Sequence, residues 1–466
     1  MEIKKTKIIE NPLELLSYKR FDLIPKIVYG FHRKMNVKSD WSRRLYEAHI
    51  MVFNGGYEVY PVKKGMKKFL EEFDKVLDSI ERKGFDESKP ISVSKEGIII
   101  DGSHRFAAGL VNGKKIHCNV ENKKGPNYDS YYFRDKIRYV PDGLQEKWSD
   151  AIALEYCKLK KNTYIVTIFP SAISKHEEII KAINKRGRVV YEKKIFIRNQ
   201  GPLNLMRQMY DDQKWLGNLV NNFKGGQIKA MNCFVNKGPV RIFLIESKDL
   251  DRVNKIKNEI RDIFKIGNHS VHINDSHDYT VKLAQIFFNE NSIHFLNNAR
   301  LKNLKTFYSL LREYKRWLED NNYDKEHFCI DGSSILSIYG LRDVNDLDFL
   351  SRSFIDSPNN KINCHNKDLE YEKEIDDLIF NPENHFYFDG LKFISLGILK
   401  EIKAKRNELK DKIDLELIEG MDEDFFAMGQ DKESIRARIV RTYAFQKLNY
   451  VFNRVHSLFA PFLNRL

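Results

Sequence analysis

Two carboxylates one residue apart, Asp346 and Asp348, are the side chains with the clearest capacity for chemistry in this chain. Apolar residues flank them, and alternate residues of a strand share a face, so both are expected to point the same way. Two like charges held that close are costly unless a cation lies between them, and Mg²⁺ binds carboxylate and phosphate oxygens together. The pair therefore predicts a Mg²⁺ site, and the alternative is a solvated surface strand.

A glycine and a serine, Gly332 and Ser333, stand upstream of this pair and lead into an apolar segment. If they open a helix, their backbone N–H groups are expected to face a phosphate. Gly-Ser followed at this spacing by Asp-x-Asp resembles the nucleotidyltransferase superfamily of the polymerase-beta type. The resemblance implies that Asp346 and Asp348 are catalytic and hold the metal, while Gly332 and Ser333 bind the nucleotide phosphates.

A basic stretch follows at 399–415, where a single helix is predicted to carry charged residues three or four positions apart on one face. The stretch is similar to a helix beside the active site in nucleotidyltransferases of the toxin–antitoxin and resistance type. That resemblance implies a triphosphate contact for the first lysine. The alternative is a charged surface helix with internal ion pairs. The matching residues are Lys403, Arg406, Lys410, Asp411 and Asp414. Asp389, in a predicted Asp-Gly turn, is not assigned as a third carboxylate.

Near the N-terminus, a strand is predicted to stop at Asp-Gly and a helix to begin with His-Arg, which is an arrangement suited to an anion. These residues, 101–105, with the long helix at 64–83 and the strand at 90–94, resemble the ParB/sulfiredoxin-like fold. Ser103 replaces the cysteine that sulfiredoxins need, so their chemistry is excluded. Free-serine kinases of this fold use the turn for nucleotide phosphates. The resemblance thus implies phosphate binding by Asp101, Gly102, Ser103, His104 and Arg105.

Glu58 is a possible acidic base for such a kinase. The alternatives are a fold that only binds a nucleotide or a protein, and a simple capping role for Asp101 at the helix start.

The middle of the chain alternates strands and helices in a ferredoxin-like pattern, with a helical stretch at 210–223. It looks like a nucleoside diphosphate kinase domain. The resemblance implies that His272 is a phosphohistidine, with Asp275 and Ser276 after it, that Arg261 binds phosphate and that Trp215 stacks on a base. Phe169-Pro170 stands where the family has Lys-Pro, and the segment at 246–261 is too short for its nucleotide-covering loop. The domain is therefore read as degenerate, and the alternative is a module that only packs or binds.

The composition of the chain indicates which kinds of partner it binds and in which cellular compartment it works. The net charge of +14 favours anionic partners, although no basic block is dense enough to require nucleic acid. The 5 cysteines have no CxxC spacing, which argues for a reducing compartment and against zinc. No apolar signal core or membrane-length run is visible. These features predict a cytoplasmic protein.

The fold class expected from the pattern is a multidomain mixture of α/β and α+β. The predicted domains are a ParB/sulfiredoxin-like domain at 1–150, a nucleoside diphosphate kinase-like domain at 158–300 and a nucleotidyltransferase-like domain at 304–466. The last is expected to contain an amphipathic helix at 304–318, a polar loop at 356–367, an acidic helix at 368–377 and a β-hairpin at 385–395 on the Asp-Gly turn. It ends in an amphipathic helix at 434–466 that either docks on the domain or contacts a membrane surface or a glycosyltransferase.

Together these features predict a Mg²⁺-dependent nucleotidyl- or phosphotransferase, including kinase activity, that uses an NTP such as ATP or CTP. The expected acceptor is a small phosphorylated metabolite, sugar or polyol, in the setting of capsule, teichoic-acid-like or other surface polysaccharide synthesis. The alternatives are a nucleic-acid-directed protein, either ParB-like or a tRNA-modifying defence nucleotidyltransferase, and a scaffold of decayed domains. The lack of a helix-turn-helix pattern and of a concentrated basic stripe argues against nucleic acid.

Overall fold

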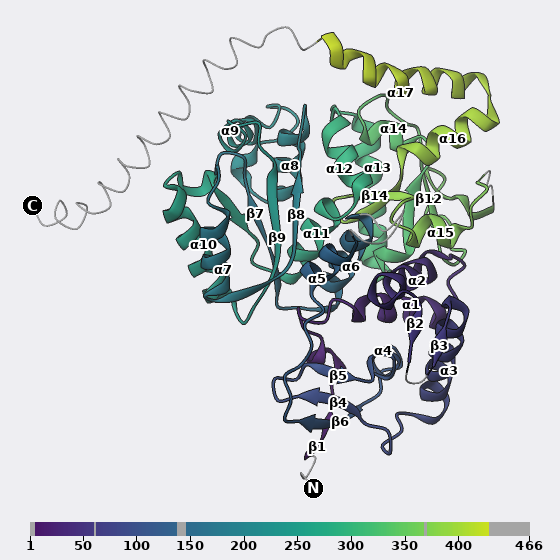
Figure 1. The fold of residues 1–466 in the computed structure, drawn as a ribbon. Coiled ribbons are helices and arrows are strands. Elements are labelled where there is room, and N and C mark those ends of the chain that lie inside the picture. Colours follow the sequence, from purple (N-terminus) through teal and green to yellow (C-terminus); the bar gives the residue numbers. More distant parts are fainter. Residues whose placement is uncertain (1–4, 60–61, 138–145, 368–370, 428–466) are drawn as a thin grey trace, which may run out of the picture. The chain divides into compact units, whose positions relative to one another are not determined.

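A computed structural model describes residues 5–59, 62–137, 146–367 and 371–427 of the chain (Figure 1). It is a mixed α/β structure with several small sheets, in agreement with the expected class. The predicted amphipathic helix at 434–466, with its membrane or protein contact, lies outside the described residues. Among the residues that are described, no helix is long and apolar enough to cross a membrane.

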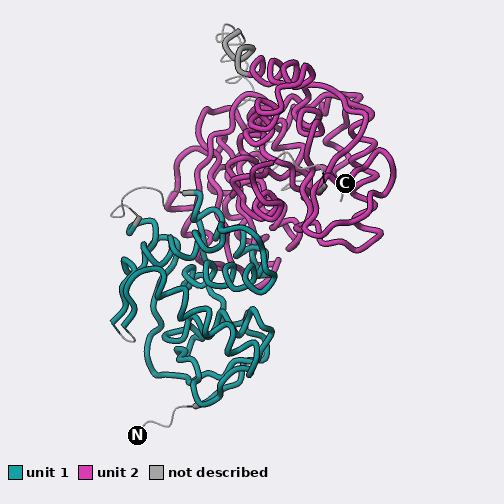
Figure 2. The backbone as a smooth tube through the Cα atoms, turned by 90° about the vertical axis from the view of Figure 1, so that its right-hand side faces the viewer, with its two compact units in different colours: residues 1–163, 188–191 teal, residues 164–187, 192–466 magenta. Residues whose placement is uncertain are grey.

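The chain forms two compact units, coloured separately in Figure 2. Unit 1 comprises residues 1–163 and 188–191, and unit 2 comprises residues 164–187 and 192–466. Unit 2 contains more than one sheet, and the division of this region into two domains near residue 300 stays a prediction.

Unit 1 is built on a four-stranded sheet of order β1-β6-β4-β5, in which β4 and β6 are parallel and the outer pairs antiparallel. The predicted long helix is confirmed as α3, whose apolar residues recur every three or four positions and are buried while the rest of its surface is charged. The strands are β1 (Lys5–Ile9), β4 (Ile91–Ser94), β5 (Ile99–Asp101) and β6 (Ile116–Glu121), with a small hairpin of β2 (Tyr57–Glu58) and β3 (Lys63–Lys64). The helices are α1 (Leu23–Lys34), α2 (Trp41–Asn54), α3 (Met66–Lys83), α4 (Ser103–Val111), α5 (Ser130–Ile137) and α6 (Glu146–Leu159).

A second sheet has the order β10-β7-β9-β8. Its strands are β7 (Thr163–Ile168), β8 (Gly187–Ile195), β9 (Val240–Ser247) and β10 (Val271–Ile273), and β7 and β9 are buried almost throughout. Its helices are α7 (His176–Asn184), α8 (Gly201–Met209), α9 (Lys224–Cys233), α10 (Leu250–Phe264), α11 (His277–Phe287) and α12 (Glu290–Asn298). Helices α7 and α10 pack together on one side of the sheet (Figure 1).

The prediction of a helix at 210–223 is wrong. Helix α8 ends at Met209, one short 3₁₀ turn follows at Lys214–Leu216, and turns continue to α9. Gly217 has a φ of +89°, and the Asn218 side chain accepts hydrogen bonds from the backbone of Val220 and Asn221. Asparagine and glycine give this segment local hydrogen bonds and backbone angles that compete with a helix.

A third sheet, entirely within unit 2, has the order β13-β12-β11-β15-β14. Its strands are β11 (Phe328–Asp331), β12 (Leu347–Ser351), β13 (Ile362–Cys364), β14 (His385–Phe388) and β15 (Leu391–Ile394). The helices of this region are α13 (Lys305–Asp320), α14 (Ser334–Ile338), α15 (Ile375–Phe380), α16 (Leu396–Arg406) and α17 (Leu409–Ala427). The predicted amphipathic helix α13 and the hairpin on Asp389-Gly390 are confirmed, since α13 buries its apolar face and β14 pairs with β15 across that turn.

Three predictions in this region need correction. The polar loop at 356–367 contains strand β13, which pairs in parallel with β12. The acidic helix predicted at 368–377 is not helical at residues 371–374, and α15 begins at Ile375. The single basic helix at 399–415 divides at Asn407, whose φ of +56° ends α16 before α17 begins.

Candidate functional site

The candidate site is built where strand β11 ends beside β12. The two strands are antiparallel, and Asp331 lies directly opposite Asp348 in their register. Side chains of directly opposed residues lie on the same face, so the two carboxylates are neighbours. Gly332 then turns the chain with a φ of +63°, and a Cβ at this position would come within 2.9 Å of Asp348 Oδ2. Glycine is required here both for the left-handed turn and for close approach to the carboxylate.

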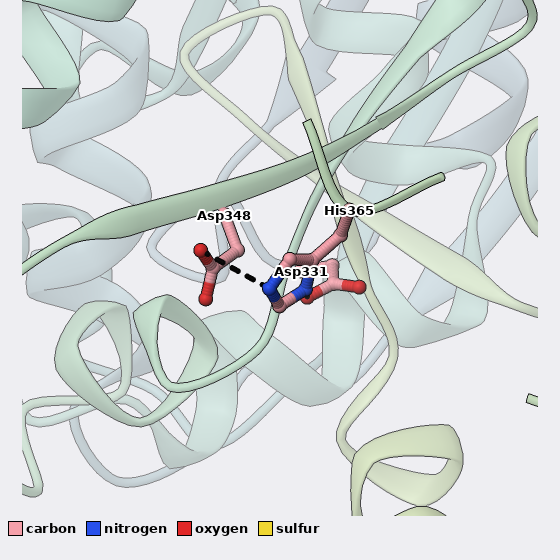
Figure 3. A group of neighbouring side chains, drawn as sticks. All are labelled: Asp331, Asp348 and His365. Carbon is pink, nitrogen blue, oxygen red and sulfur yellow. Dashed lines mark ion pairs between the residues drawn. The ribbon is translucent and has the colours of Figure 1, made fainter. Parts of the chain in front are cut away.

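A histidine from the neighbouring strand completes this group. His365 follows β13 directly, and its ring lies between the two carboxylates (Figure 3). Its Nδ1 is 3.5 Å from Asp331 Oδ1, and its Nε2 is 3.4 Å from Asp348 Oδ1. One ligand atom from each of the three residues lies within 4.8 Å of the others. We call Asp331, Asp348 and His365 the Asp–Asp–His group.

Burial makes negative charge unfavourable in this group. Asp331 is only 1% exposed, and its Oδ2 accepts a 2.8 Å hydrogen bond from Tyr371. Its Oδ1 is buried and has no hydrogen-bond partner. The pKa of Asp348 is raised to about 6, mainly by burial and also by the charges of Asp331 and Asp346, while His365 opposes the shift. An orphaned buried carboxylate oxygen beside a second carboxylate and an imidazole is a donor set that fits a divalent cation.

The residues predicted from the Asp-x-Asp motif are only partly brought together. Asp346 stands just before β12, is exposed and lies outside the Asp–Asp–His group. Ser333 does precede a helix, but α14 has only five residues, so the expected helix N-terminus is a single turn. The Ser333 hydroxyl accepts a 2.8 Å hydrogen bond from Arg342. Phosphate binding at Gly332-Ser333 stays a prediction.

Lys403 is a buried member of an ion-pair network, so it does not lie on the charged surface helix that was the alternative prediction. It is 3% exposed, and its Nζ lies 3.2 Å from Asp411 and 2.8 Å from Asp414. Asp414 is also held by Arg342 at 2.6 Å, and Asp411 by Arg406 at 2.6 Å. These ion pairs hold the pKa values of both carboxyls below their usual range, although burial opposes the shift. The Lys403 amine is bound by these two carboxylates in this structure. Its predicted contact with a triphosphate stays a prediction.

The turn at 101–105 and Glu58 lie around one cavity of about 490 Å³ in unit 1. The cavity's charged groups pair with one another: Arg105 bonds Asp101 at 2.9 Å, and Lys63 bonds Glu58 at 2.6 Å. Gly102 precedes α4 without any side-chain cap, so Asp101 does not cap this helix. His104 is partly buried, and its Nε2 bonds Tyr46 at 2.9 Å. The structure thus brings these predicted residues together, and their phosphate contact stays a prediction.

A buried ion network that the sequence did not reveal also borders this cavity. Arg20 Nε lies 2.7 Å from Asp22, Lys26 is 3.4 Å from the same carboxylate, and Arg20 donates to the Ser103 hydroxyl at 2.7 Å. Burial lowers the pKa of Lys26 to about 8, although Asp22 opposes this shift. Arg20 and Lys26 together hold the pKa of Asp22 far below its usual range against the effect of burial.

A second cavity, of about 600 Å³ and entirely within unit 2, surrounds His272. The predicted Arg261, Trp215 and Asp275 line it, so the structure brings these residues together. Ser276 instead caps α11 by accepting from the Tyr279 backbone. Four further lining residues were not predicted, and they add two cations and two aromatic rings: Lys229, Lys257, Tyr210 and Tyr279.

His272 is held neutral in this cavity. The Tyr210 hydroxyl lies 3.1 Å from its Nδ1, and its Nε2 is buried without a hydrogen-bond partner. Burial lowers the pKa of His272 to about 3, and the charges of Lys257, Lys229 and Arg261 act in the same direction. A neutral imidazole with one free nitrogen is chemically able to act as a nucleophile or to bond a ligand.

The buried neutral state of His272 predicts an acid sensitivity that a His272→Gln variant lacks. The folded pKa of about 3 lies below the ordinary value of 6.5, so the unfolded chain binds more protons between these values. The free energy of unfolding therefore falls as the pH drops below 6.5. From pH 7 to pH 5 the unmodified chain should lose about 2 kcal/mol more than His272→Gln. Urea unfolding at both pH values measures this difference, and equal losses in the two proteins would contradict the buried neutral state.

Two residues of the Asp–Asp–His group, Asp331 and His365, were not predicted as site residues from the sequence. Asp331 did carry a signal, because it is a carboxylate at the end of an apolar strand directly before Gly332. His365 carried none, because it lies in a polar stretch whose strand β13 was not predicted.

Comparisons with known proteins found no match for this chain among protein-family models, curated proteins or solved structures.

Proposed function

We propose that this chain is a divalent-cation-dependent transferase that moves a nucleotidyl or phosphoryl group from an NTP to a small phosphorylated metabolite, sugar or polyol. The observation that carries the proposal is the pairing of Asp331 with Asp348 beside the Gly332 turn, where a buried carboxylate oxygen has no hydrogen-bond partner. Carboxylates gathered in this way are the ligands that a metal–nucleotide complex needs.

The chain's own residues would divide the work as follows. Asp348, with Asp331 opposite it in the β11–β12 register, would hold the cation, which when bound would neutralise triphosphate charge and align the attacking group. Gly332 lets the turn pass close to the Asp348 carboxylate, because it carries no Cβ. Arg342 fixes the Ser333 hydroxyl at 2.8 Å while it is itself anchored by Asp414. Through Arg342 and Asp414, the buried network around Lys403 would therefore help to position the Gly-Ser turn.

The cavity around His272 supports the handling of a phosphorylated compound. Lys229 and Lys257 donate to backbone carbonyls, and Arg261 Nε is buried without a hydrogen-bond partner. Three cations against two carboxylates around about 600 Å³ leave an excess of positive charge that favours an anionic ligand, and the exposed Trp215 offers a ring for stacking. The element order and the sheet order β10-β7-β9-β8 support the ferredoxin-like assignment of this region. A setting in surface polysaccharide synthesis remains part of the proposal.

Incubation with each γ- or α-labelled NTP, Mg²⁺ and a panel of polyol and sugar phosphates tests the reaction class. We expect pyrophosphate release if a nucleotidyl group is transferred and NDP release if a phosphoryl group is transferred. The control is the same incubation with EDTA, which should stop either product. Absence of both products with every NTP and acceptor, by a folded protein, would argue against the proposal.

A further inference from the structure

The Asp–Asp–His group carries an inference about which metal this chain binds. A Mg²⁺ site built only on Asp346 and Asp348 offers oxygen ligands alone, which suits Mg²⁺. In this structure Asp348 instead has Asp331 opposite it and His365 within 3.4 Å, while Asp346 is exposed and outside the group. The donor set is thus two carboxylates and one imidazole.

We propose that Asp331, Asp348 and His365 form a binding site for a divalent transition cation of the Mn²⁺ class, with higher affinity than for Mg²⁺. Carboxylates suit Mn²⁺ among the transition cations, and imidazole nitrogen suits transition cations better than Mg²⁺, which prefers oxygen ligands and keeps much of its water. The inference deepens the proposed function and rests on it for the location of the reaction, but metal binding itself is measured without any nucleotide.

Two independent features point into this site. Asp331 is 1% exposed, and its Oδ1 has no hydrogen-bond partner while it faces the His365 ring. Tyr371 bonds the other oxygen of the same carboxylate at 2.8 Å, which fixes the orientation of the side chain. Hydrogen-bonded ligand carboxylates of this kind are usual around protein-bound metals.

The Gly332 turn is the second feature. A Cβ there would lie 2.9 Å from Asp348 Oδ2, so the backbone passes as close to the carboxylate as a side-chain-free residue allows. The three ligands come from three adjacent strands or their ends, β11, β12 and the end of β13, which the sheet holds together. Ligands placed on sheet elements are held more firmly than ligands placed on a free loop. The remaining explanation is a protonated His365 that bridges the carboxylates without any metal.

Mn²⁺ titration of the metal-stripped full chain, followed by electron paramagnetic resonance, tests the site directly. We expect one site per chain that binds Mn²⁺ at least about tenfold more tightly than Mg²⁺ in competition. Nitrogen hyperfine coupling to the bound Mn²⁺ should appear and should vanish in His365→Gln. That variant should lose about tenfold in Mn²⁺ affinity and keep its weak Mg²⁺ affinity. His365 is about one-third exposed at its side chain, so its replacement is expected to leave the fold intact.

The carboxylate variants separate the two possible ligand sets. Asp331→Asn should weaken Mn²⁺ binding at least tenfold, roughly as metal-ligand loss does, whereas Asp346→Asn should leave it unchanged. Asp320→Asn, an exposed position on α13, is the matched control. Absence of Mn²⁺ binding, absence of nitrogen coupling, or loss of binding in Asp346→Asn but not in Asp331→Asn overturns the inference. Mn²⁺ binding without any NTP turnover would support the site and count against the proposed reaction alone.

Discussion

Asp348→Asn is expected to lower kcat/KM for NTP-dependent transfer by at least about 1,000-fold, which corresponds to about 4 kcal/mol of lost transition-state stabilisation. The substitution keeps the size of the side chain and removes its negative charge. Asp348 is the residue shared by the predicted Asp-x-Asp pair and by the Asp–Asp–His group. Loss of this carboxylate therefore weakens cation binding under either ligand set. Steady-state release of pyrophosphate or NDP measures the effect.

The same variant should keep or gain stability, which separates lost chemistry from lost folding. Burial raises the pKa of Asp348 to about 6, so its negative charge is unfavourable in the metal-free chain. A neutral amide avoids that cost, as is common for residues retained for activity and not for stability. The metal-free variant should melt at the same temperature as the unmodified chain or higher. Turnover within tenfold of the unmodified chain would rule out the central role of Asp348.

Asp22→Asn is expected to cost unit 1 about 3 to 5 kcal/mol of unfolding free energy, because it removes the counter-charge of a buried network. Asp22 is 2% exposed and pairs with Arg20 and Lys26, which are 2% and 4% exposed. Lys26, whose pKa burial already lowers to about 8, can shed its proton, whereas Arg20 stays charged. Most of the lost unfolding free energy therefore comes from leaving the charged Arg20 buried without its carboxylate. Denaturant unfolding and hydrogen exchange in α1 and α4 measure it.

Asp78→Asn is the matched control in the same unit. Asp78 pairs with Arg33 at 2.8 Å, but its side chain is 38% exposed, so its loss should cost less than about 1 kcal/mol. If Asp22→Asn and Asp78→Asn were equally mild, the Arg20–Asp22–Lys26 network would not contribute to stability as its burial implies. If only hydrogen exchange near the 101–105 turn increased, the network would serve local order through the bond from Arg20 to Ser103.

Much of the local structure of this chain follows from short-range sequence patterns. The apolar spacing of α3 and α13 predicted their length and their buried faces, because side chains three and four positions apart share one side of a helix. The Asp389-Gly390 hairpin followed from turn chemistry that needs a positive φ, which both residues adopt. The break at Asn407 was not predicted in this way. The charged residues keep helical spacing across Asn407, but the backbone of Asn407 adopts a left-handed conformation that ends α16.

The sequence by itself placed Asp348 in a strand beside an apolar run and put a glycine turn before it, because these features depend on neighbouring residues. Only the tertiary structure decided that Asp331, and not Asp346, lies against Asp348, since strand register joins residues that are far apart in the chain. It likewise brought His365 into the group through the parallel pairing of β13 with β12. The tertiary structure also buries Lys403 and pairs it with Asp411 and Asp414, because a charged group removed from water needs an opposite charge close to it.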